Sequence, residues 1–119
     1  MPYTRADLQC EAEEALESVW FVQHTEVYAR TEITFAVRLY LREDLFVQAF
    51  LGERSGALYF ALIERGRRIF GIDLEGGEWH RHPYDAPDQH EMLLHGPGPR
   101  PLPAFLVHVE EILLVHSLL

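Results

Sequence analysis

Three histidines gather in one short polar stretch of the chain, residues 76–91 (GGEWHRHPYDAPDQHE). Four carboxylates and a tryptophan lie in the same stretch, and its glycines and prolines are typical of turns. In an extended segment, residues i and i+2 point to the same side, with their Cα atoms about 6–7 Å apart. We therefore expect His80 and His82 to project together, with Arg81 on the opposite side.

One chemistry open to this histidine pair is general acid–base catalysis. Histidine changes its charge nearest to neutral pH, and two imidazoles can act as base and acid in the internal transesterification of RNA without a metal or other cofactor. Arg68 and Arg81 could then hold the phosphate through planar bidentate contacts, and Trp79 could stack on a base. Because loop histidines bury little area, replacing either one should leave stability nearly unchanged.

The same stretch could instead bind a divalent metal ion. Two imidazoles at this spacing can share an ion if the chain bends slightly, with His90 as a third ligand. Other candidates for the third ligand are Asp85, Asp88 and Glu91. Mixed nitrogen and oxygen ligands suit zinc, manganese, iron or nickel. A solvated loop is the remaining interpretation, because loops of this composition on acidic proteins often have no further role.

Asp73 is the most informative carboxylate outside this stretch. It falls at the end of a predicted strand, where a rigid support often carries a functional side chain. We expect it to anchor the histidines as part of a catalytic group with them. Its structural alternative is a turn residue that accepts hydrogen bonds from local backbone amides.

Hydrophobic periodicity predicts the elements that position these residues. Thr4 and Asp7 form a Thr-x-x-Asp box, and apolar residues at helical spacing predict a helix over about residues 5–19. Alternation with period two then predicts a series of strands. These are residues 21–29, 31–41, 45–51, 57–63 and 68–74. Short turns between them favour an antiparallel meander, since parallel pairing needs long crossovers.

The C-terminal segment predicts a second helix. Residues 96–103 (GPGPRPLP) lead into it, because proline is well placed in a first helical turn, and apolar residues then recur at helical spacing. We expect a single α+β domain over residues 1–119. Its predicted architecture is a twisted antiparallel meander of about five strands with an N-terminal and a C-terminal helix packed on it.

Two predicted strands, 45–51 and 57–63, are apolar on both faces. A sheet that is covered on one side only would show cleaner alternation of apolar and polar residues. The long loop, a helix or a second subunit must therefore cover the other face. This pattern predicts a homodimer, because large exposed apolar patches usually mark interfaces.

Composition limits the possible functions. The 119 residues suffice for one ordinary domain, and no apolar run approaches the length of a membrane span. The acidic N-terminus lacks a signal core, which predicts a cytoplasmic protein. Cys10 is the single cysteine, which excludes an internal disulfide and a multi-cysteine zinc site. A net charge of −9 repels nucleic acid in general but leaves room for a local basic site around residues 65–68.

The predicted strand that ends in Arg-x-x-x-x-Asp (Arg68 to Asp73) runs into the loop that carries His80, His82 and His90. With a helix at each end, this layout resembles that of the small TumE-like proteins, a family of toxins from toxin–antitoxin modules. The family commonly has an Asn-Ala-Pro-His-His type of sequence after the aspartate. Here Leu-Glu-Gly-Gly follows it, and the histidines come later as His-Arg-His-Pro. The resemblance implies a toxin with a cognate antitoxin as partner.

Two functions of different classes remain open from the sequence. The first is a toxin-like ribonuclease with a catalytic group of His80, His82 and Asp73, and with Arg68, Arg81 and Trp79 as substrate-binding residues. The second is a non-catalytic homodimeric module whose two-sided apolar sheet binds a protein partner. The concentrated histidines, arginines and aspartate favour the first, and the net charge of −9 favours the second.

Overall fold

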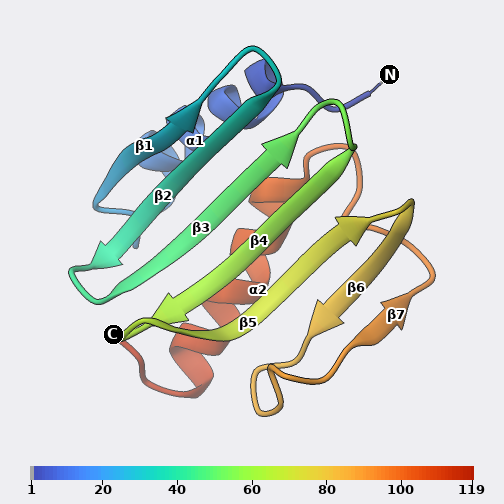
Figure 1. The fold of residues 1–119 in the computed structure, drawn as a ribbon. Coiled ribbons are helices and arrows are strands. Elements are labelled where there is room, and N and C mark those ends of the chain that lie inside the picture. The colour runs from blue at the N-terminus through green and yellow to red at the C-terminus, as the bar shows by residue number, and fades with distance from the viewer. Residues whose placement is uncertain (1) are drawn as a thin grey trace.

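The computed structural model describes residues 2–119 and contains one antiparallel sheet of seven strands with two helices (Figure 1). The elements are α1 (Arg5–Ser18), β1 (His24–Arg30), β2 (Thr34–Arg42), β3 (Leu45–Gly52), β4 (Ala57–Glu64), β5 (Arg67–Glu75), β6 (Glu78–His82), β7 (Glu91–Leu93) and α2 (Pro101–Val115). Each strand pairs with its neighbour in the sequence, so the sheet is a simple meander. The predicted α+β class with an antiparallel sheet and two terminal helices is confirmed.

Local sequence signals explain both helices. The Thr4 side chain accepts a hydrogen bond from the backbone N–H of Asp7, and the Asp7 carboxylate accepts one from the backbone N–H of Thr4. Pro101 occupies the first turn of α2, where a missing N–H costs nothing. Within residues 2–119, no helix has the length and apolar character that crossing a membrane requires.

Both helices pack on the same face of the sheet, behind it in the view of Figure 1. The buried residues of the strands point toward them, including Leu39, Val47 and Leu62. The ring of Phe105 from α2 stacks on Phe60 and Phe70, with ring centroids 5.4 Å apart in each case. The core therefore lies between the helices and one sheet face.

The sheet has two strands more than the sequence analysis predicted. The segment after residue 74, taken there as one long loop, contains β6 and β7. Gly76 and Gly77 both have positive φ angles, 60° and 81°, and form the two-residue turn that joins β5 to β6. Because of this pairing, Asp73 lies inside β5 opposite His80, and does not mark the point where the chain leaves the sheet.

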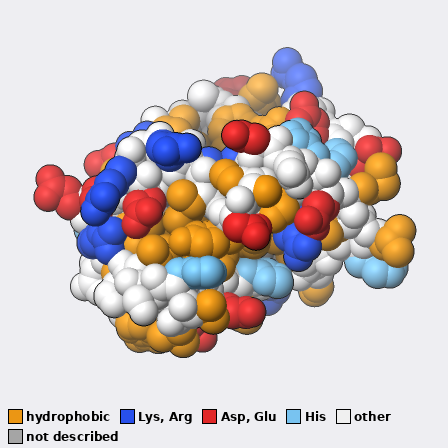
Figure 2. Space-filling view, turned by 90° about the horizontal axis from the view of Figure 1, so that it is seen from below, with side chains coloured by type: hydrophobic (Ala, Val, Ile, Leu, Met, Phe, Trp, Pro, Cys, Tyr) orange, Lys and Arg blue, Asp and Glu red, His pale blue; other side chains and the backbone are white. Residues whose placement is uncertain are grey.

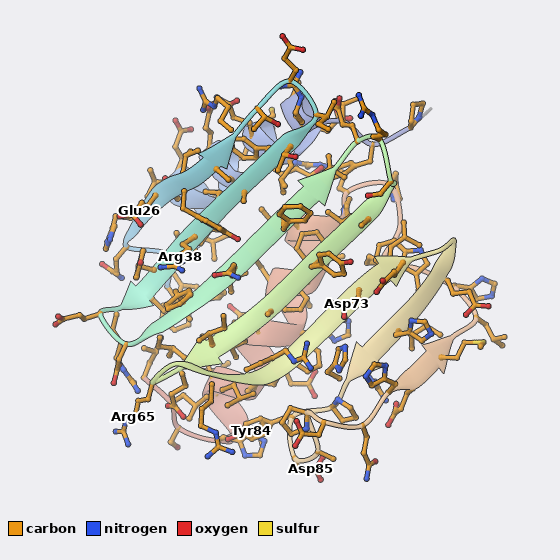
Figure 3. The ribbon with its side chains drawn as sticks, viewed as in Figure 1. Glu26, Arg38, Arg65, Asp73, Tyr84 and Asp85 are labelled. Carbon is orange, nitrogen blue, oxygen red and sulfur yellow. The ribbon has the colours of Figure 1, made fainter. Side chains whose placement is uncertain are left out.

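Within residues 2–119, the second face of the sheet carries no helix. We call it the open face. Its central side chains are half-buried aromatic and aliphatic groups, with a few polar groups among them (Figure 3). They include Arg38, Tyr40, Phe46, Gln48, Phe50, Tyr59 and Ile63. In the two strands that are apolar on both faces, the helices cover the side chains of one face. The side chains of the other face remain uncovered in the single chain.

Candidate functional site

Strand pairing places three of the predicted site residues together on the open face. Asp73 pairs with His80, and Gly71 pairs with His82, so these positions project to the same side of β5 and β6. Gly71 makes room for its neighbours, because a Cβ atom there would lie 3.3 Å from Cδ of Arg68 and 3.5 Å from Cδ2 of His82. The absence of a side chain at this position lets Arg68 and His82 pack over the sheet.

His82 is the best-anchored group of the site. Its side chain is 2% exposed, and its Nε2 lies 2.7 Å from Oδ2 of Asp73. Its Nδ1 lies 3.1 Å from the carbonyl oxygen of Pro87 and donates a hydrogen bond to it, since a carbonyl can only accept. Both ring nitrogens are therefore occupied. His82 was expected to be a loop histidine that buries little area. This prediction is wrong, because His82 is buried and lies within a strand.

His80 and His90 lie on either side of this anchored ring and are more accessible. The ring centroid of His90 is 4.4 Å from that of His82 and 6.0 Å from that of His80. The His80 side chain is 24% exposed, with Nε2 3.7 Å from Oε2 of Glu78. His90 is exposed and directly precedes β7. The site thus combines one fixed, buried imidazole with two more accessible ones.

Arg68 connects the cluster to the rest of the open face. Its Nη2 donates to the carbonyl oxygen of Pro87 at 3.4 Å, the same oxygen that accepts from His82. Beside Arg68 lies a shallow pocket of about 370 Å³. It is lined by Tyr28, Gln48, Phe50, Tyr59, Ala61, Arg68 and Asp73. Burial raises the pKa of Tyr59, and the nearby charges of Glu75 and Asp73 raise it further, so this phenol stays protonated at neutral pH.

Trp79 and Arg81, the other two predicted substrate-binding residues, do not lie with the histidines. They alternate with His80 and His82 along β6, so they project toward the helix side of the sheet. Trp79 packs against the core and against Gly96, where an added Cβ would come within 2.4 Å of the indole Nε1. Arg81 donates from Nε to the Glu91 carboxylate at 3.0 Å.

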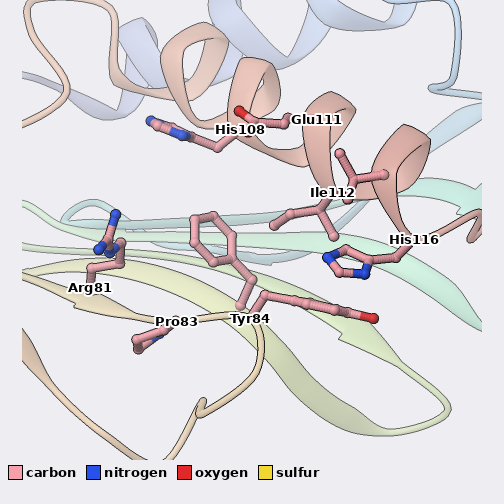
Figure 4. Close-up of a pocket in the computed structure, with 9 residues that line it drawn as sticks. Arg81, Pro83, Tyr84, His108, Glu111, Ile112 and His116 are labelled. Carbon is pink, nitrogen blue, oxygen red and sulfur yellow. The ribbon is translucent and has the colours of Figure 1, made fainter.

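Arg81 lines a second pocket, of about 350 Å³, between α2 and the segment that follows β6 (Figure 4). The rings of Tyr84 and His116 line it, with centroids 4.0 Å apart, and His108 and Glu111 extend from α2. Figure 2 shows the molecule from below, with histidine side chains beside a hydrophobic patch that charged groups surround. This pocket is separated from the open face by the thickness of the sheet.

The residues proposed as metal ligands are not arranged around a common point. Among residues 2–119, no group of three or more His, Cys, Asp or Glu side chains could hold a metal ion, and this includes the set His80, His82 and His90. The hydrogen bonds of His82 explain part of this result, because neither of its nitrogens has a free lone pair directed at its neighbours.

Sequence reasoning gave His90 a role only as a metal ligand, and it gave Phe50 and Tyr59 no role in a site. The signal for the two aromatic residues was present, since they stand on the second apolar face of strands 45–51 and 57–63. Their position beside Arg68 and Asp73 follows from the pairing of β3, β4 and β5.

No protein-family model matches the sequence, and no curated protein or solved structure is significantly similar to the chain. The arrangement of side chains on the open face therefore carries the functional argument.

Proposed function

We propose that this protein is a toxin-like ribonuclease of the TumE-like kind, which cleaves RNA in the cytoplasm and is neutralised by a cognate antitoxin. The observation that carries the proposal is the cluster of His80, His90 and the anchored pair His82–Asp73, with Arg68 beside it, at the border of the open face. Imidazoles with a nearby guanidinium supply both the proton transfers and the charge that internal transesterification of RNA needs.

The acid and the base in this proposal are His80 and His90. One neutral imidazole accepts the proton of the ribose 2′-hydroxyl as its oxygen attacks the phosphorus atom. The other, as imidazolium, donates a proton to the departing 5′-oxygen, so the products are a 2′,3′-cyclic phosphate and a free 5′-hydroxyl. Their ring centroids, 6.0 Å apart, are close enough for both rings to reach oxygens of one phosphodiester. Arg68 faces the charge that develops on the non-bridging oxygens.

His82 and Asp73 act here as positioning residues. Because both nitrogens of His82 are hydrogen-bonded, it is a poor proton carrier unless one of these bonds breaks. Its bond to the Pro87 carbonyl fixes the segment that leads to His90, and its ring contacts the His90 ring directly. The acid–base pair expected from the sequence, His80 with His82, is thus replaced in the proposal by His80 with His90.

The proposal is tested by incubating the purified chain with RNA in the presence of EDTA. The expected result is cleavage with cyclic phosphate ends and a bell-shaped pH profile, since acid and base must have opposite protonation states. His80→Ala and His90→Ala should each lower the rate by about a hundredfold or more, within the usual range for a lost acid or base. His95→Ala is the matched control, because His95 is an exposed histidine that follows β7 and has no role in the proposal.

A second candidate function is a non-catalytic homodimeric interaction module. The uncovered aromatic side chains of the open face favour it, because such patches often mark protein interfaces. Light scattering at micromolar concentration tests this candidate directly. A dimer that is broken by Phe46→Glu, together with no RNA cleavage, would support it over the ribonuclease.

A further inference from the structure

The open face combines half-buried aromatic rings with arginines that are free of carboxylate partners. Phe50 and Tyr59 lie on neighbouring strands with ring centroids 5.7 Å apart, and both line the pocket beside Arg68. A second group continues across β2 and β3, where the Tyr40 and Phe46 centroids are 5.1 Å apart. These rings are held by the sheet, so they lose little freedom when a flat ligand stacks on them.

The arginines of this face are not used in ion pairs. Among residues 2–119, the arginines that lie within 4.0 Å of a carboxylate are Arg5, Arg42, Arg65, Arg81 and Arg100. Arg38 and Arg68 of the open face are not in this set. The guanidinium carbon of Arg38 lies 4.9 Å above the Phe46 ring, although Glu26 is its partner in the strand register (Figure 3).

We propose that the open face binds single-stranded RNA, with one unstacked base against Phe50 and Tyr59 and the backbone running between Arg38 and Arg68. This inference rests on the proposed ribonuclease function and assigns its substrate class. Aromatic rings on an open sheet stack bases of any sequence, while arginines neutralise the phosphates between them. The pocket of about 370 Å³ beside Phe50 has room for one base.

The position of the pocket relative to the histidines explains why the substrate would be single-stranded. Asp73 lines this pocket and also accepts the hydrogen bond of His82. A base in the pocket would therefore lie directly beside the histidine cluster. Bases in an A-form duplex are stacked on one another and cannot leave the helix for an aromatic ring without loss of pairing. The acidic total charge of −9 disfavours a duplex further, because a duplex presents more negative charge along its length.

The test measures binding of a fluorescein-labelled 2′-O-methyl RNA octamer, which has no 2′-hydroxyl for cleavage, by fluorescence anisotropy. The full chain should bind the single strand at least about tenfold more tightly than the same strand annealed to its complement. Phe50→Leu and Tyr59→Leu keep apolar area but remove the stacking ring, so each should weaken binding by roughly fivefold or more. Arg38→Gln should lower the slope of log Kd against log salt concentration by about 0.7.

Trp20→Ala is the matched control, since Trp20 is a 60% exposed aromatic residue outside the open face and should leave binding unchanged. Circular dichroism confirms that each variant is folded. Equal affinity for duplex and single strand, or unchanged binding in both leucine variants, would overturn the inference. So would a stable dimer that buries Phe50 and Tyr59 and binds no octamer.

Failure of this inference can be distinguished from failure of the proposed function. If the leucine variants cleave and bind RNA as the wild type does, the ribonuclease proposal stands and the substrate assignment falls. If the wild type binds the octamer as described but cleaves no RNA, the binding surface stands and the ribonuclease proposal falls.

Discussion

Replacement of His82 by alanine should destabilise the fold far more than replacement of the neighbouring histidines. The imidazole is 2% exposed and hydrogen-bonded at both nitrogens, to Asp73 at 2.7 Å and to the carbonyl of Pro87 at 3.1 Å. Alanine would remove both bonds and leave a hole under the segment that carries Pro87. The side chain of Asp73 is 16% exposed, so water can replace part of the lost interaction.

The expected loss follows from these contacts. A hydrogen bond to a charged group contributes about 1.5–3 kcal/mol, and a neutral one about 1 kcal/mol. Partial hydration of Asp73 reduces this sum, while the vacated volume adds to it. The free energy of unfolding should therefore fall by about 2–4 kcal/mol, which corresponds to a decrease in Tm of roughly 10 °C for a domain of this size.

Urea unfolding, monitored by tryptophan fluorescence, measures this difference. His90→Ala is the control, because that side chain is exposed and should change the unfolding free energy by less than about 0.5 kcal/mol. A double-mutant cycle with Asp73→Ala isolates the pair, with an expected coupling energy of about 1–3 kcal/mol. The reasoning is refuted if His82→Ala is no more destabilising than His90→Ala, or if the coupling energy is near zero.

Three other properties can be checked on the same protein. Burial raises the pKa of Glu11, so the folded chain binds the proton of this carboxyl more tightly than the unfolded chain does. The bound proton therefore contributes to stability at low pH, and this stability is lost as the pH rises from 4.5 through the raised pKa of the folded state. In urea unfolding, the free energy of unfolding of Glu11→Gln should rise relative to that of the wild type between pH 4.5 and 7. A difference between the two proteins that does not change with pH would contradict this. Gly96→Ala should lower Tm and shift tryptophan emission, because its Cβ would displace the indole of Trp79; unchanged spectra would argue against that contact. Addition of zinc or nickel should leave Tm unchanged, and a saturable increase that His80→Ala abolishes would restore the metal interpretation.

The parts of the fold that were predicted correctly have strong local signals. The capping box at Thr4 and Asp7 fixes the start of α1, and the alternation in β2 to β5 marks strands that bury one face under the helices. The strands β6 and β7 were missed because four of the five residues of β6 are polar or charged, and because β7 has only three residues. The residues EWHRH show no alternation of apolar and polar side chains, although Trp79 packs against the core.

The candidate site was only partly predictable for a different reason. The proximity of His80 and His82 follows from local spacing, whereas the bond between His82 and Asp73 depends on the register of β5 with β6. Register is set by the Gly76–Gly77 turn and by packing of the whole sheet. The same alternation that pairs the histidines sends Trp79 to the other face, so a site drawn from sequence proximity alone joined residues that the sheet separates.

Cleavage of RNA by the purified chain in EDTA, with His90→Ala and His95→Ala measured in parallel, tests the central claim most directly. The account predicts cleavage with 2′,3′-cyclic phosphate ends by the wild type and by His95→Ala. It also predicts a rate about a hundredfold or more lower for His90→Ala, because the proton carrier beside the anchored His82 is lost. Cleavage by His90→Ala at the rate of the wild type, or no cleavage by any of the three proteins, would contradict it.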